Sequence, residues 1–139
     1  MRKPLFLFLC LFFSLTAPLT ALATVPKELS GAWKNVEKNE AGQLTVFVAN
    51  QNKNELRGTI IVTGTTSCKN PISFLGKVSG RRILIESDEK NVCGKDGKFS
   101  VEATREQEAF YVGTFSYVWM GGVWASGTFQ LSANGQLNN

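Results

Sequence analysis

The chain has 139 residues, with 15 basic and 11 acidic side chains and no histidine. A net charge of +4 is too small to indicate a nucleic acid as partner. The absence of histidine removes the commonest general base and the imidazole of Ser-His-Asp and Cys-His sites. We therefore expect a protein that is not an enzyme.

The first 23 residues have the pattern of a secretory signal peptide. Met1-Arg2-Lys3 is a short cationic start, Leu5 to Leu19 is apolar, and Ala21-Leu22-Ala23 is a small-x-small cleavage site. The apolar segment is short for a membrane span, and an uncleaved anchor is the alternative. We predict a signal peptide at residues 1–23 and one domain at 24–139. The mature protein is then secreted or periplasmic, without stable insertion in a membrane.

The remainder alternates apolar and polar residues and shows no sustained helical periodicity. Clusters of Gly, Asn and Asp interrupt the alternation and divide it into short strands. The predicted strands are 31–36, 44–49, 55–63, 72–78, 82–86, 99–105, 110–119 and 123–131. Eight consecutive short strands favour an all-β, antiparallel up-and-down barrel, with a β-sandwich as the alternative. The interior of such a barrel is either filled with side chains or holds one small ligand.

The start of the first predicted strand resembles a known group of barrels. Gly31-Ala32-Trp33 is similar to the Gly-x-Trp start of the calycins, which include lipocalins, avidins and small bacterial metalloprotease inhibitors. In those families the Trp closes one end of the barrel, so the resemblance implies a structural role for Trp33. The order of segments 29–35, 56–59 and 113–115 resembles that of avidins and implies a ligand contact for Asn35.

The segment from Glu28 to Trp33 also resembles the beginning of the metalloprotease inhibitors of that group. There, a tail ahead of the barrel enters the cleft of the protease. The resemblance implies that role for residues 24–27.

Two cysteines remain after removal of the signal peptide, Cys68 and Cys93. In an exported protein an even pair is most simply a disulfide, and we predict that these two are joined. Two free thiols or a metal pair are the alternatives, but a zinc site would lack ligands because the chain has no histidine. No metal and no cofactor are expected.

The last predicted hairpin carries the candidate binding residues. If Gly121-Gly122 form a two-residue turn, Trp119 lies opposite Trp124. One face then combines large aromatic and hydrogen-bonding side chains, as a ligand cavity or protein interface requires. Its candidate ligand-binding members are Phe115, Tyr117, Trp119, Trp124, Ser126 and Thr128. The opposite face is expected in the core and carries Val112, Val118, Met120, Val123, Ala125, Gly127, Phe129 and Leu131. The alternative is an outer surface whose aromatic pairs stabilise the hairpin.

The charged segments give little indication of chemistry. Arg81-Arg82 could bind an anion but is more simply a solvated surface pair. The acidic residues between 86 and 97 lack the alternating oxygen ligands of a calcium loop. Glu102, Glu106 and Glu108 do not form the facing carboxylates of a glycosidase.

These observations favour an exported small β-barrel that binds a small apolar ligand in its interior or a secreted or periplasmic protein at one rim. Oligomerisation is left open. The second hypothesis is an inhibitor or immunity-type protein that acts on a protease or another hydrolase. The third is a carboxylate-based hydrolase.

Overall fold

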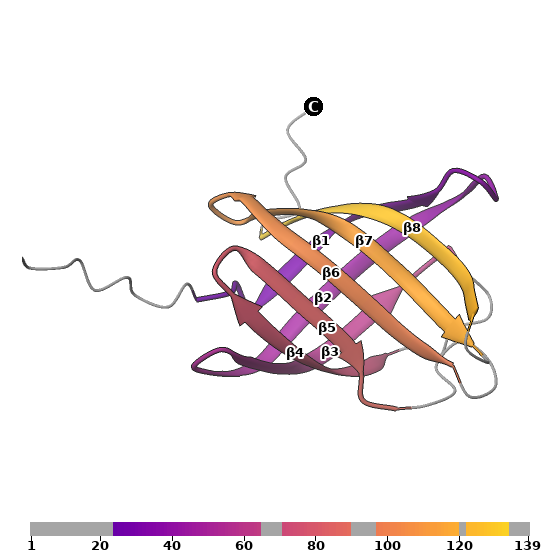
Figure 1. Cartoon of the computed structure of the whole chain (residues 1–139). Helices are drawn as coiled ribbons and strands as arrows, with labels where there is room; N and C mark the ends of the chain where they lie inside the picture. The colour runs from indigo at the N-terminus through magenta and orange to yellow at the C-terminus, as the bar shows by residue number, and fades with distance from the viewer. Residues whose placement is uncertain (1–23, 65–70, 90–96, 120–121, 134–139) are drawn as a thin grey trace, which may run out of the picture.

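The computed structural model describes residues 24–64, 71–89, 97–119 and 122–133, and these form a closed barrel of antiparallel strands (Figure 1). The strands are β1 (Glu28–Asn35), β2 (Glu40–Asn52), β3 (Glu55–Val62), β4 (Ile72–Ser79), β5 (Arg82–Ser87), β6 (Lys98–Gln107), β7 (Phe110–Trp119) and β8 (Gly122–Ser132). Among the described residues, no helix has the length and apolar character that crossing a membrane requires.

Each strand pairs with the next along the chain, and β8 pairs with β1 to complete the ring. The pairing of β1 with β8 runs from Ser30↔Ser132 to Lys34↔Thr128. Closure leaves no free sheet edge. The prediction of an all-β up-and-down barrel is therefore confirmed, and the sandwich alternative is wrong.

The observed strands follow the alternation of the sequence, with small differences at their ends. β7 has the predicted bounds, whereas β2 extends four residues earlier and three residues later than predicted. Leu56, Ile60 and Val62 of β3 are buried on one face, as expected. Val36, predicted as the end of the first strand, lies beyond β1 and is 79% exposed.

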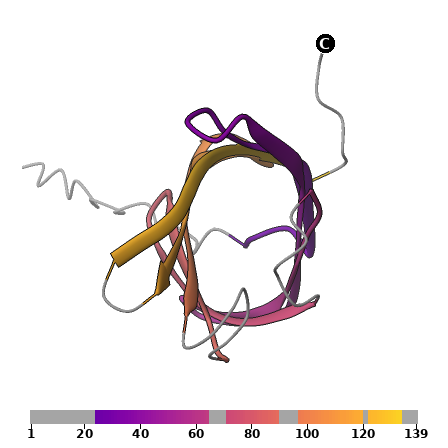
Figure 2. The same cartoon turned by 90° about the vertical axis from the view of Figure 1, so that its right-hand side faces the viewer.

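The two ends of the barrel differ in how they are built. The end that we call the closed end carries the tight turns at 53–54, 80–81 and 108–109 and the beginning of the described chain. Seen along the barrel, this first segment crosses the opening of the ring (Figure 2). The opposite end, called the far end, carries the turn at 36–39 and the connections that include residues 65–70, 90–96 and 120–121.

Candidate binding surfaces

The predicted hairpin face is divided between the inside and the outside of the barrel. β7 turns Tyr111 and Tyr117 into the core, where both are buried, and Phe115 packs against the same cluster. Ser126 and Thr128 of β8 are exposed on the outer wall. The six candidate residues therefore do not share one face.

The reason is a shift of register near the tip of the hairpin. Trp119 pairs with Gly122 and Val118 with Val123, but Tyr117 pairs with Ala125, so the register skips Trp124. The predicted opposition of Trp119 and Trp124 is thus wrong. Because side chains alternate along a strand, an error of one residue in register exchanges the faces. The side chains of Trp119 and Trp124 lie outside the described part of the structure.

Because of this register shift, part of the predicted core of the hairpin is wrong. Phe129 and Leu131 are buried as expected, whereas Val118 is 37% exposed and Val112 is half-buried. The inward side chains of β7 instead include those of Tyr111, Phe115 and Tyr117. Met120 lies outside the described residues, as do the side chains of Val123 and Ala125.

Aromatic rings line the interior toward the far end. Trp33 meets Phe115 edge to face with ring centroids 5.3 Å apart, and Phe115 stacks on Phe99 at 5.8 Å. The Trp33 indole Nε1 donates a hydrogen bond of 2.9 Å to the main-chain carbonyl of Thr63. Trp33, Phe99 and Tyr117 are each less than 5% exposed. These residues form a packed layer, and Trp33 has the structural position that the resemblance implies.

Asn35 is buried at the end of β1, next to this layer. Its Oδ1 atom accepts a hydrogen bond of 3.2 Å from the Lys38 main-chain N–H. The side-chain amide oxygen of Asn35 therefore closes the turn at 36–39, a common role of Asn at such positions. Its ligand contact, implied by the resemblance to avidins, stays a prediction.

Aliphatic side chains fill the interior toward the closed end. They surround a cavity of about 10 Å³, which is room for at most one water molecule. The lining residues are Val25, Leu29, Val46, Val48, Leu56, Ile83, Ile85, Val101, Ala103, Tyr111 and Leu131. Pockets that bind small molecules usually measure about 300–1,000 Å³. This half of the barrel is a core without space for such a ligand.

The segment before β1 is part of that core. Val25 is 4% exposed, and its main-chain N–H donates a hydrogen bond of 2.9 Å to Gln51 Oε1. The Lys27 carbonyl accepts one of 2.8 Å from the N–H of Val48. The role of residues 24–27 as a free inhibitory tail, implied by the resemblance, does not fit this arrangement because the segment closes the barrel.

A broad hollow of about 620 Å³ lies on the wall formed by β7, β8 and β1. Two rows of cross-strand neighbours form its floor, Val112–Gln130–Ala32 and Thr114–Thr128–Lys34. Among the described residues that line it, Lys34 alone is charged. We call this surface the β8 wall. It is a depression in the outer surface with a single charged lining residue, and Thr128 is the predicted site residue that belongs to it.

The basic pair has partners within the protein. The Arg81 guanidinium donates hydrogen bonds of 2.7 Å to the carbonyls of Arg105 and Glu106. Arg82 forms an ion pair with Glu102. Both arginines therefore hold β5 to β6, and the reading of this pair as an anion site loses its support.

The remaining predicted sites are not visible here. Cys68 and Cys93 lie outside the described residues, so their disulfide stays a prediction. Among the described residues, no three His, Cys, Asp or Glu side chains come close enough together to hold a metal ion.

Comparison with protein-family models, with curated proteins and with solved structures finds no match to this chain.

Proposed function

We propose that this chain is an exported binding protein, without catalytic activity, that contacts another protein through the β8 wall. The observation that carries the proposal is the contrast between the aliphatic half of the barrel interior and the outer surface. The cavity among the aliphatic core residues measures about 10 Å³, whereas the hollow on the β8 wall measures about 620 Å³. A ligand inside the closed half would have to displace core side chains, but a partner on the wall would not.

The composition of the β8 wall suits a protein partner. The centres of protein interfaces are poor in charged residues, and the floor of this hollow is made of Ala, Val, Thr and Gln side chains with one Lys. Thr114, Thr128 and Gln130 offer hydrogen-bonding groups beside the apolar Val112 and Ala32. Such a surface would bind by shape and by a few hydrogen bonds, with Lys34 at the end of one of its two rows.

Export is part of the proposal and makes the partner a secreted or periplasmic protein. An exported protease or other hydrolase belongs to this class, and its inhibition would then use the wall rather than residues 24–27. The exported form should weigh two hydrogens less than the reduced chain because of the Cys68–Cys93 disulfide. Two thiols that can be alkylated without reduction would contradict that bond.

A photo-crosslinking experiment tests the binding surface. The photoreactive amino acid benzoylphenylalanine replaces Thr128 on the β8 wall or, as the matched control, Ser79 at the exposed end of β4. After irradiation in the native compartment, we expect an adduct with a different protein from position 128 and not from position 79. The substitution Ala32→Arg should reduce that adduct because it places a long charged side chain in the hollow.

Two results would contradict the proposed function. One is an equal yield of adducts with a different protein from both positions, which would mean that the wall makes no specific contact. The other is a small molecule that stays bound to the purified protein in native mass spectrometry, with no adduct at position 128. That result would favour the alternative of an internal ligand.

A further inference from the structure

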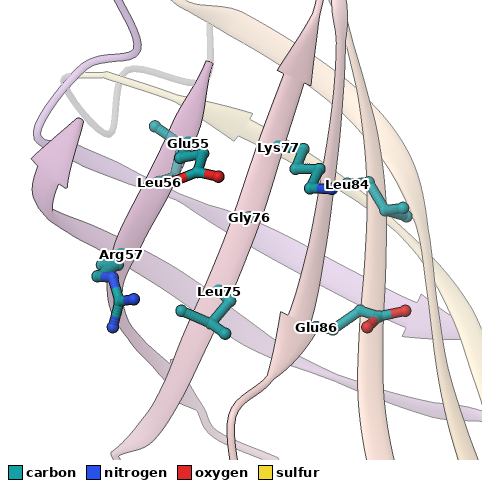
Figure 3. A pocket seen from close by; sticks show the side chains of 8 residues that line it. All are labelled: Glu55, Leu56, Arg57, Leu75, Gly76, Lys77, Leu84 and Glu86. Atoms are coloured by element: carbon teal, nitrogen blue, oxygen red, sulfur yellow. The ribbon is translucent and has the colours of Figure 1, made fainter. Parts of the chain in front are cut away.

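Two large apolar side chains are exposed on neighbouring strands of the opposite wall of the barrel. Leu75 of β4 is 40% exposed and Leu84 of β5 is 46% exposed. They border a hollow of about 340 Å³ that is otherwise lined mainly by charged side chains (Figure 3). Single exposed leucines are common, but an apolar pair within a ring of charges is typical of a contact surface.

The charges around the two leucines have a regular arrangement. Leu75 pairs across the strands with Glu86, and Leu84 pairs with Lys77. These four side chains therefore occupy the corners of a quadrilateral, with the leucines on one diagonal and the opposite charges on the other. We call this group the β4–β5 patch. In the described part of the chain, neither Lys77 nor Glu86 takes part in an ion pair.

This arrangement is complementary to itself. A second copy can be turned by 180° about an axis that lies in the surface along the Leu75–Leu84 diagonal. Each leucine then meets the same leucine of the second copy, because both lie on the axis. The rotation exchanges the other two corners, so Lys77 of each copy meets Glu86 of the other. Reciprocal contacts of this kind are the property of a two-fold interface.

We propose that the β4–β5 patch binds a second copy of this chain and forms a symmetric dimer. Charge complementarity at the two corners supports this occupant, because Lys77 and Glu86 of one patch meet their opposites when two identical patches meet. An unrelated partner would require its own matching pair of charges. In the ring of strands, β4 lies opposite β8, so the dimer leaves the β8 wall free.

The size of the patch predicts a weak dimer. Neighbouring strands lie about 4.8 Å apart, so the three strands from β3 to β5 that line the hollow span only about 10 Å of the surface. Interfaces that bury less than about 1,200 Å² are generally weak or transient. We therefore expect monomers in dilute solution and dimers at high protein concentration.

Charge exchange provides a sharp test. The purified protein is examined by sedimentation equilibrium over a wide concentration range, together with Lys77→Glu, Glu86→Lys and the double variant. We expect a reversible dimer in the natural protein and dissociation constants at least about tenfold larger in both single variants, since each would bring like charges together. The double variant restores opposite charges and should dimerise to within about threefold of the natural protein.

Lys98→Glu is the matched control because it makes the same charge change on β6, outside the patch. It should leave the dimer unchanged. Leu84→Gln should weaken the dimer and, because the side chain is exposed, leave the melting temperature of the monomer nearly unchanged. If a charge variant does not fold, Leu84→Gln tests whether the β4–β5 patch forms the dimer contact.

The proposal is overturned by any of three results. The first is a natural protein that remains monomeric throughout the concentration range. The second is single variants that dimerise like the natural protein. The third is a double variant that folds but does not recover dimerisation. The first result would leave a different partner as occupant of the patch, and the second would place the dimer contact elsewhere. Crosslinking through position 128 is unaffected by these outcomes, so the proposed function and the dimer are tested separately.

Discussion

Trp33 and Thr63 are joined by a hydrogen bond that spans a strand. The Nε1 atom of Trp33 on β1 donates to the Thr63 carbonyl, just beyond β3, at 2.9 Å. The intervening strand, β2, has Gly42 beneath the indole, where a Cβ atom would lie 2.7 Å from Nε1. The ring therefore fixes three consecutive strands at the far end of the barrel.

Replacing Trp33 by Phe should destabilise the fold by about 1–3 kcal/mol, because the variant loses this hydrogen bond and leaves part of the indole volume empty. Urea unfolding followed by circular dichroism measures the change. Val36→Ala, at a residue that is 79% exposed, should change the free energy of unfolding by less than about 0.5 kcal/mol. Equal values for the two variants would show that Trp33 does not hold the strands together.

Two turns at the closed end allow a matched comparison of backbone strain. Gly80 and Ala109 have φ angles of 59°, in the left-handed region that costs a residue with a Cβ atom about 1 kcal/mol or more. Gly80→Ala should therefore destabilise the protein by about 1 kcal/mol, since a Cβ there meets nothing within 4 Å and the backbone cost stands alone.

Ala109→Gly should have the opposite sign and stabilise by up to about 1 kcal/mol, because the strain is relieved. Part of this gain is lost to the greater freedom of glycine in the unfolded chain. Thermal melting of both variants measures the difference. A lower melting temperature for Ala109→Gly would mean that the methyl group makes a contact worth more than the strain.

The sequence was sufficient to predict the barrel, because inward and outward residues alternate in nearly every strand. Gly31-Ala32-Trp33 correctly indicated the first strand and the buried Trp. The exposure of Leu84 could also be predicted from the sequence. Ile83-Leu84-Ile85 is an uninterrupted apolar run, and its central member must face outward if its neighbours are buried. The pairing of that leucine with Leu75 depends on the register of β4 and β5, which the pattern of one strand does not contain.

The candidate site could not be predicted as well, and the last hairpin shows why. Its two strands were correctly identified, but the shift at Tyr117 and Val118 changes the register by one residue. Gly121-Gly122 fits a two-residue turn as well as it fits the observed hairpin. Phe115 and Tyr117, which were placed on a binding face, therefore pack in the core, while Thr128 lies on the outer wall.

The segment at residues 24–27 should contribute to stability. Val25→Asp would bury a carboxylate among aliphatic side chains, and we expect a loss of about 3 kcal/mol or more. Thr24→Asp adds the same charge at an exposed neighbour and is the control. Chemical unfolding measures both. Nearly equal stability of the two variants would mean that the segment is free, as an inhibitory tail requires.

Tyr111 should make the protein less stable in alkaline solution. It is 3% exposed inside the barrel, and burial raises the pKa of its phenol above the usual value of 10.0, although the Arg105 guanidinium opposes this shift. Below about pH 10 the phenol is protonated in both states, and its stabilising contribution is complete. Above that pH the unfolded chain releases the proton first, so the free energy of unfolding falls as the pH rises toward the pKa of the folded state.

Tyr111→Phe isolates this contribution because it removes the phenol and leaves every other side chain of the protein in place. Urea unfolding at about pH 8, 9, 10 and 11 should show a steeper loss of stability for the natural protein than for the variant. The free energy of unfolding of the natural protein minus that of the variant should be constant below about pH 9 and should fall above pH 10. Parallel curves over the whole range would mean that the phenol titrates alike in the folded and unfolded states, and that burial does not raise its pKa.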